Sequence, residues 1–229
     1  MRIVAIETSG TRGSLAALAG EPHRARLLRQ IILSSDQRTA KVLAPALRAL
    51  LSDVGWSPNS VQLVAVTVGP GSFTGLRIGV TTAKIFAYAV GGEIIGVNTL
   101  AVLATQAPPH ARPLWTVMDA QRQELFVARF HSANEGDDAN AMTSIISQDT
   151  WLAGLKPDDH VTGPALRRLA KRLSHGVIAL PEDLWQPTAS AVGQLAWQLY
   201  QGGRRDDVWK LVPNYYRPSA AEEKASKNK

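Results

Sequence analysis

The sequence contains no cysteine among its 229 residues. This absence excludes disulfide bonds, thiolate nucleophiles and thiolate metal sites, and it fits a reducing compartment. The uncharged run at 94–111 includes glycine, asparagine and two prolines, so it would be costly in a lipid bilayer. Neither end has the apolar segment and small-residue cleavage site of a targeting signal. We therefore expect a cytoplasmic protein without a membrane span.

Aromatic residues are sparse at 6%, whereas hydrophobic residues make up 45% and supply enough material for folded cores. The formal net charge is +6, which permits contact with RNA or nucleotides. No aromatic residues interleave with the basic ones in the sequence, so we interpret the basic clusters as solvated surface. These clusters are Arg24/Arg26/Arg29, Arg167/Arg168/Lys171/Arg172 and Arg204/Arg205.

Apolar positions divide the first hundred residues into short runs and helical stripes. Each short run is bounded by glycine, proline or polar residues, as expected of strands, whereas two longer segments repeat apolar residues at helical spacing. The order βββαβαβ that results predicts an α/β fold. The expected strands are 2–6, 13–18, 26–33, 61–68 and 93–97, and the expected helices are 38–54 and 73–90.

A weaker copy of this order follows. Segments 114–118 and 124–130 predict a hairpin, and segment 188–201, which lies between a proline and two glycines, predicts a helix. Two copies of one topology indicate a duplicated fold whose second half is reduced. The expected divisions are an N-terminal half at 1–100, a C-terminal half at 101–217 and a disordered tail at 218–229, which has almost nothing to bury.

The segment GPGSFTGLRIG at 69–79 joins an expected strand to an expected helix, which is the usual geometry for binding phosphate. The known fingerprints fail, however. Thr74 stands where the dinucleotide motif needs glycine, no Lys-Ser/Thr pair follows Gly75, and Ser72 does not have the flanking glycines of a nucleophile elbow. The glycines are therefore interpreted as a packing surface.

Small residues recur every fourth position in the helix at 73–90, beside apolar columns of both expected helices. Such a helix is buried on more than one side, and a smooth ridge lets a second helix approach closely. We predict a docking face for a partner protein; closure of the surface within the domain is the alternative. The residues are Gly75, Gly79, Ala83, Ala87, Leu76, Val80, Leu43, Leu47 and Leu50.

Five motifs carry a resemblance to a known family. They are IETS at 6–9, GPGSFTGLRIG at 69–79, GVNTL at 96–100, MDAQRQELFVARF at 118–130 and VPNYYR at 212–217. Together they resemble the bacterial TsaB (YeaZ) family over nearly the whole chain. Arg38, Gln121 and Gln123 depart from the family's usual residues, Gln123 standing where glycine is common.

The resemblance implies a duplicated actin-like/Hsp70-like ATPase (ribonuclease H-like) fold. It also implies a role in making N6-threonylcarbamoyladenosine at position 37 of tRNAs that read ANN codons. The expected partners are a TsaD-like catalytic paralogue, a TsaE-like ATPase and, through the complex, tRNA. ATP and metal are expected on the partner subunits, and a homodimer is expected for the isolated chain.

The catalytic paralogue has His-x-x-x-His where this chain has Thr99 and Leu103, and leucine cannot bind a metal. No two of the five histidines are spaced at i,i+3 or i,i+4, so we expect no metal in this chain. Glu7, Thr8 and Ser9 form the strand-turn that approaches phosphate in the superfamily. We interpret them as a vestigial phosphate loop, retained for structure, and expect no cofactor on this chain alone.

The sequence is therefore interpreted as a non-catalytic subunit that stabilises a catalytic partner. A peptidase of the glycoprotease type and a stand-alone RNA-binding protein are the alternatives. Pro213, Tyr215 and Arg217 are expected to tie the C-terminal segment to the body of the protein, because tyrosine and arginine combine buried apolar area with a polar tip.

Overall fold

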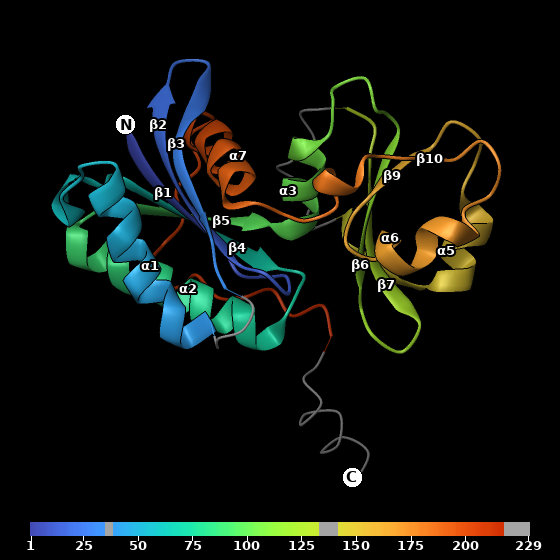
Figure 1. Cartoon of the computed structure of the whole chain (residues 1–229), viewed down its shortest axis with the longest axis horizontal. Helices are drawn as coiled ribbons and strands as arrows, with labels where there is room; N and C mark the ends of the chain where they lie inside the picture. Colours follow the sequence, from blue (N-terminus) through green and yellow to red (C-terminus); the bar gives the residue numbers. More distant parts are fainter. Residues whose placement is uncertain (35–38, 133–141, 218–229) are drawn as a thin grey trace, which may run out of the picture.

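A computed structural model describes residues 1–34, 39–132 and 142–217. The chain forms two five-stranded sheets, each with helices packed against it (Figure 1). The expected tail at 218–229 and the departure at Arg38 lie outside the described residues. Within the described ranges, no helix is both long and apolar enough to cross a membrane.

The first sheet has the strand order β3-β2-β1-β4-β5. Strand β1 pairs antiparallel with β2, β2 pairs antiparallel with β3, and β4 and β5 continue the sheet in parallel with β1. The expected order of three strands, a helix, a strand, a helix and a strand is confirmed. The strands are β1 (Arg2–Glu7), β2 (Ser14–Glu21), β3 (Arg24–Ile32), β4 (Leu63–Gly69) and β5 (Glu93–Asn98).

Helices α1 (Thr39–Asp53) and α2 (Phe73–Val90) cover one face of this sheet (Figure 1). Helix α2 has the predicted bounds because both of its ends are capped. The Ser72 side chain accepts a hydrogen bond from the Gly75 amide at 3.2 Å, and Gly91 ends the helix in the left-handed conformation, with φ of 65°. A short turn helix, η1 (Pro58–Ser60), precedes β4.

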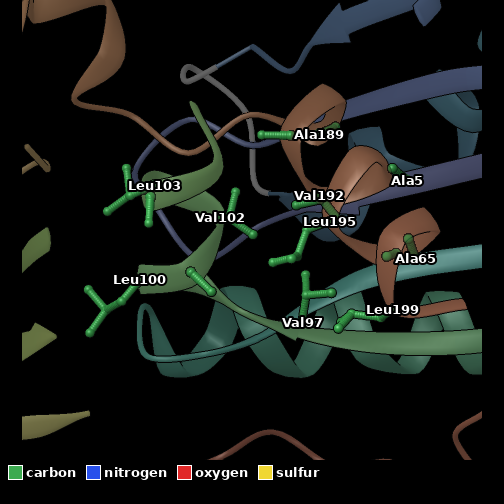
Figure 2. Close-up of a cluster of buried hydrophobic side chains, with 14 of the residues drawn as sticks. Ala5, Ala65, Val97, Leu100, Val102, Leu103, Ala189, Val192, Leu195 and Leu199 are labelled. Carbon is green, nitrogen blue, oxygen red and sulfur yellow. The ribbon is translucent and has the colours of Figure 1, made fainter. Parts of the chain in front are cut away.

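Helices α3 (Thr99–Gln106) and α7 (Ala189–Gln201) cover the opposite face (Figure 2). Alternate strand residues such as Ala5, Ala65 and Val97 point toward these helices and leave room for the larger leucines of α7. Helix α7 follows the second sheet in the chain but packs on the first. The boundary between the halves near residue 100 stays a prediction, with the segment from residue 188 onward returning to the N-terminal sheet.

The second sheet repeats the topology of the first. Its order is β10-β9-β6-β7-β8, with two antiparallel pairs on one side of β6 and two parallel pairs on the other, and the predicted β6–β7 hairpin is confirmed. Short helices replace the long pair, so the second half is reduced. The elements are β6 (Leu114–Asp119), β7 (Glu124–Phe130), β8 (Ser144–Ser147), α5 (Gln148–Gly154), β9 (His160–Thr162), α6 (Leu166–Leu169), η3 (Ala170–Arg172), β10 (Ile178–Ala179) and η4 (Glu182–Leu184).

Residues 207–217, here called the strap, run beside α2 and back to the second sheet. Lys84 of α2 donates to the carbonyl oxygens of Trp209 at 3.1 Å and Leu211 at 3.0 Å. The Arg77 Nε donates to the Tyr215 hydroxyl at 2.8 Å. Arg217 donates to the Ala120 carbonyl at 2.6 Å and forms an ion pair with Glu124. Tyr215 and Arg217 therefore make the tertiary contacts that were expected of them.

Removing residues 212–217 of the strap is expected to lower the melting temperature, because the contacts of Arg77 with Tyr215 and of Arg217 with Ala120 and Glu124 are lost together. A chain ending at residue 211 should melt several degrees below the full chain, since about 1 kcal/mol shifts the melting temperature by roughly 2–4 °C at this size. A chain ending at Arg217 should melt like the full chain. Thermal circular dichroism of both truncations checks this result, and equal melting temperatures would contradict it.

Candidate functional site

A cleft of about 900 Å³ opens where the two halves meet. One wall comes from the turn after β1 and the turn between β4 and α2, and the other comes from the β6–β7 turn and the start of α6. Strap residues complete the lining. Representative residues from these segments are Ser9, Gly71, Gln121, Arg168 and Tyr215. The glycine segment thus borders the cleft, at the carboxyl ends of parallel strands.

The glycines of α2 are needed for the close approach of this helix to the end of β1. A Cβ atom at Gly75 would lie 2.1 Å from the Thr8 carbonyl oxygen, and one at Gly79 would lie 2.1 Å from the Thr8 Oγ1. The Ser72 amide donates to the Ser9 carbonyl at 2.7 Å and fixes the same contact at the turn. This geometry favours the interpretation of the glycine segment as a packing surface.

The surface that these glycines pack against lies within the same chain, and this corrects the predicted docking residues. All nine are buried between the helices and the first sheet, because both helices turn their apolar stripes toward the strands. Their side chains are not available to a partner protein. The nine are Leu43, Leu47, Leu50, Gly75, Leu76, Gly79, Val80, Ala83 and Ala87.

The outward faces of the two helices remain exposed. On α1, small side chains and one arginine line a shallow hollow, and on α2 the exposed stripe includes two large apolar side chains. The sequence could have indicated these residues, since the helical period places them on the face of each helix opposite its apolar stripe. The residues are Ala44, Pro45, Arg48, Ala49 and Ser52 on α1, and Thr81, Ile85 and Tyr88 on α2.

Glu7, at the end of β1, is completely buried. Its Oε1 accepts hydrogen bonds from the Ser9 amide at 2.6 Å and the Ser9 Oγ at 2.5 Å, while its Oε2 has no hydrogen-bond partner among the described residues. Burial raises the pKa of Glu7 to about 7, and the bonds from Ser9 oppose this shift. Glu7 is therefore partly protonated at neutral pH.

The predicted phosphate loop has only one member at the cleft. All three residues are buried, and of them Ser9 alone lines the cleft, while the Thr8 Oγ1 has no hydrogen-bond partner in the described chain. Thr99 and Leu103, which the family resemblance sets at the metal-ligand positions of a catalytic paralogue, are buried in α3. No group of three His, Cys, Asp or Glu side chains within residues 1–34, 39–132 and 142–217 is placed to hold a metal.

The basic clusters are largely engaged in ion pairs. Arg26 pairs with Glu21 at 2.7 Å and Arg205 with Glu93 at 2.6 Å, while Arg168, at the cleft, pairs with Asp119. These pairs reduce the local positive charge. The pairs of the remaining cluster members include Arg29–Asp53, Arg172–Asp149 and Arg204–Asp206.

The β6–β7 turn at the cleft has an unusual backbone. Gln121, Arg122 and Gln123 have φ of 67°, 54° and 62°, so three consecutive residues other than glycine adopt the left-handed conformation. The hydrogen bonds that hold this turn include one from the Gln121 amide to the Asp119 Oδ1 at 2.8 Å and one from the Glu124 amide to the Gln121 carbonyl at 2.9 Å. The departures at Gln121 and Gln123 therefore lie in a strained turn that lines the cleft.

Comparisons with known proteins agree on one family. Residues 26–208 match the family model described as TsaD, tRNA N6-adenosine threonylcarbamoyltransferase. The chain is 28% identical to the tRNA threonylcarbamoyladenosine biosynthesis protein TsaB of Bacillus subtilis, over 98% of this chain and 97% of that protein. It is 30% identical to the protein of the same name from Escherichia coli K12, over 98% of each.

A solved structure, YeaZ from Pseudomonas aeruginosa, resembles this chain with a TM-score of 0.75. The match covers 93% of this chain and 99% of that one, at 21% sequence identity. Together with the repeated sheet topology, this likeness confirms the α/β, duplicated actin-like (ribonuclease H-like) fold.

Proposed function

Because the chain belongs to the TsaB (YeaZ) family, we propose that it is the non-catalytic, partner-stabilising subunit of the machinery that makes N6-threonylcarbamoyladenosine in tRNA. The full-length match to two proteins named for this biosynthesis carries the proposal. The partner is a TsaD-like catalytic paralogue, and a TsaE-like ATPase and tRNA join through the complex. The lack of cysteine supports a cytoplasmic setting.

Residues of α3 support the non-catalytic role. The family resemblance sets Thr99 and Leu103 at the positions of two histidines in the paralogue, and both are fully buried, Leu103 in a core cluster that includes residues of both sheets. A leucine side chain offers no ligand atom to a metal. We therefore assign metal and ATP chemistry to the partner subunits, and a stabilising role to this chain.

Docking takes place through the outward faces of α1 and α2. The small side chains of Ala44, Ala49 and Ser52 let a partner helix approach closely, as in other packed helix pairs. A matching helix pair of the paralogue would complete a four-helix bundle. The same faces are expected to pair two copies of this chain when the paralogue is absent.

Changing Ala49 to glutamate tests this docking face. Ala49 is exposed on α1, so the variant should fold normally, but an unpaired charge in the interface should weaken binding to the TsaD-like paralogue at least tenfold. The dissociation constant is measured by isothermal titration calorimetry with both purified proteins. Self-association, measured by light scattering, should weaken as well.

Ala153→Glu is the matched control, because Ala153 is an exposed alanine in a helix of the second half, away from α1. This control should bind the paralogue like the unaltered chain. Ala83→Glu would not serve, because Ala83 is fully buried and its change would test folding. Unaltered binding by the Ala49→Glu variant would place the docking face elsewhere, and a failure of the unaltered chain to bind the paralogue would refute the proposed function.

A further inference from the structure

Exposed large apolar side chains gather along the second half of α2 and the strap. The four most exposed in the described chain are Trp209 at 69%, Tyr88 at 66%, Ile85 at 64% and Val212 at 60%. The Tyr88 and Trp209 rings meet edge to face, with centroids 5.1 Å apart. These four residues are called the strap patch. Single exposed apolar residues are common, but a contiguous group marks an interaction site.

The strap patch is held in place by the fold. Lys84 binds two strap carbonyl groups, and the Trp209 amide donates to the Asp207 Oδ1 at 2.7 Å, which fixes the turn that carries the ring. Farther along, Arg77 binds the Tyr215 hydroxyl. The backbone under the patch is therefore anchored while its side chains face solvent, and an ordered apolar surface of this kind loses little conformational entropy on binding.

The charges at the edge of the patch are mostly positive. Lys84 and Lys210 border it, and the acidic side chain of Asp207 lies 3.9 Å from the Lys210 Nζ. A second copy docked with its strap against this strap would bring the Lys210 side chains of both copies together, which is unfavourable. Tyr88 and Trp209 pack edge to face on each other, and Ile85 and Val212 offer no ring to stack on bases, so the patch favours a protein over RNA.

We propose that the strap patch is a docking ridge for the TsaD-like paralogue, which would meet it with an apolar surface bordered by acidic side chains. This inference rests on the proposed function. Ile85 and Tyr88 belong to α2, so a partner that covers the outward face of α2 also reaches the strap.

A double variant of the full chain, Trp209→Ala with Val212→Ala, tests the ridge. We expect its dissociation constant for the purified paralogue to rise at least tenfold, because exposed aromatic anchors carry much of the binding energy of an interface. The control is Ile178→Ala, a side chain on β10 of the second sheet that is 43% exposed, and this variant should bind normally. Ile85→Asp is a second test on α2 that does not depend on the conformation of the strap.

Lys210→Glu tests the charge argument. Its side chain is largely exposed, so the change should slow association with the paralogue and flatten its dependence on salt, without changing the melting temperature. Surface plasmon resonance at two ionic strengths measures both effects. A faster association after this change would overturn the assignment of an acidic partner surface.

The outcomes separate the two proposals. If the unaltered chain does not bind the paralogue, the proposed function and the docking ridge both fail. If it binds, but the double variant and Ile85→Asp bind equally well, the ridge alone is refuted. Filter binding with tRNA and light scattering of the isolated chain complete the test, because a loss confined to RNA binding or to self-association would also overturn the ridge.

Discussion

Gly75→Ala is expected to lower the free energy of unfolding by about 3 kcal/mol or more, the largest stability effect among these variants. The new methyl group would lie 2.1 Å from the Thr8 carbonyl oxygen, which belongs to the backbone and cannot rotate away. Helix α2 would have to move off the end of β1, disturbing the turn that borders the cleft. Urea unfolding followed by circular dichroism measures the change.

Gly79→Ala should be milder and, unlike Gly75→Ala, it should be rescued. Its methyl group meets the Thr8 Oγ1, a side-chain atom that is removed in the variant Thr8→Ala. The combined variant should therefore recover much of the lost stability, whereas Thr8→Ala should not rescue Gly75→Ala. Gly154→Ala, where a Cβ atom meets nothing within 4 Å, is the control and should leave stability nearly unchanged. Equal behaviour of the three glycine variants would contradict this account.

Glu7→Gln is expected to stabilise the protein above neutral pH and to change little near pH 4.5. The folded pKa of Glu7 is about 7 and its ordinary value is 4.5, so the unfolded chain releases this proton first as the pH rises. Stability is therefore lost between about pH 4.5 and 7, by roughly 3 kcal/mol in total. A glutamine avoids this loss and keeps an oxygen to accept the bonds from Ser9.

The measurement is the difference in unfolding free energy between the variant and the unaltered chain at several values of pH from 4.5 to 8.5. Taking the difference removes the contribution of other titrating groups, because these are common to both proteins. The difference should grow with pH and level off above about 7.5. A difference that is the same at every pH would show that Glu7 does not ionise in this range.

Local signals explain why much of the first half could be predicted. Helix α2 was placed at its true bounds because Ser72 caps its start, Gly91 ends it and its apolar residues keep a helical period. Helix α3 was not predicted, because it follows β5 directly and six of its eight residues are buried, so it shows no polar face. Its start depends on Asn98, whose side chain accepts from the Leu100 and Ala101 amides.

The candidate site was harder to predict, because the sequence does not show which part of the protein packs against each helix face. Small residues at every fourth position permit close approach of a strand end or of a second helix, and only the position of Thr8 decides between them. The strap has no period that would reveal which surface it covers. The exposure of Trp209 follows from tertiary anchoring by Lys84, a residue 125 positions away.

The placement of α7 sets the order in which the protein can fold during synthesis. The Ala189 amide donates to the Ser14 Oγ, and the Trp197 Nε1 donates to the Glu21 carbonyl, so these contacts join residues about 175 positions apart. Until α7 leaves the ribosome, the face of the first sheet that carries Ala5 and Ala65 has no complete cover. The nascent chain therefore holds an open apolar sheet from the synthesis of β5 until that of α7, which makes that interval its period of greatest exposure to aggregation and to chaperones.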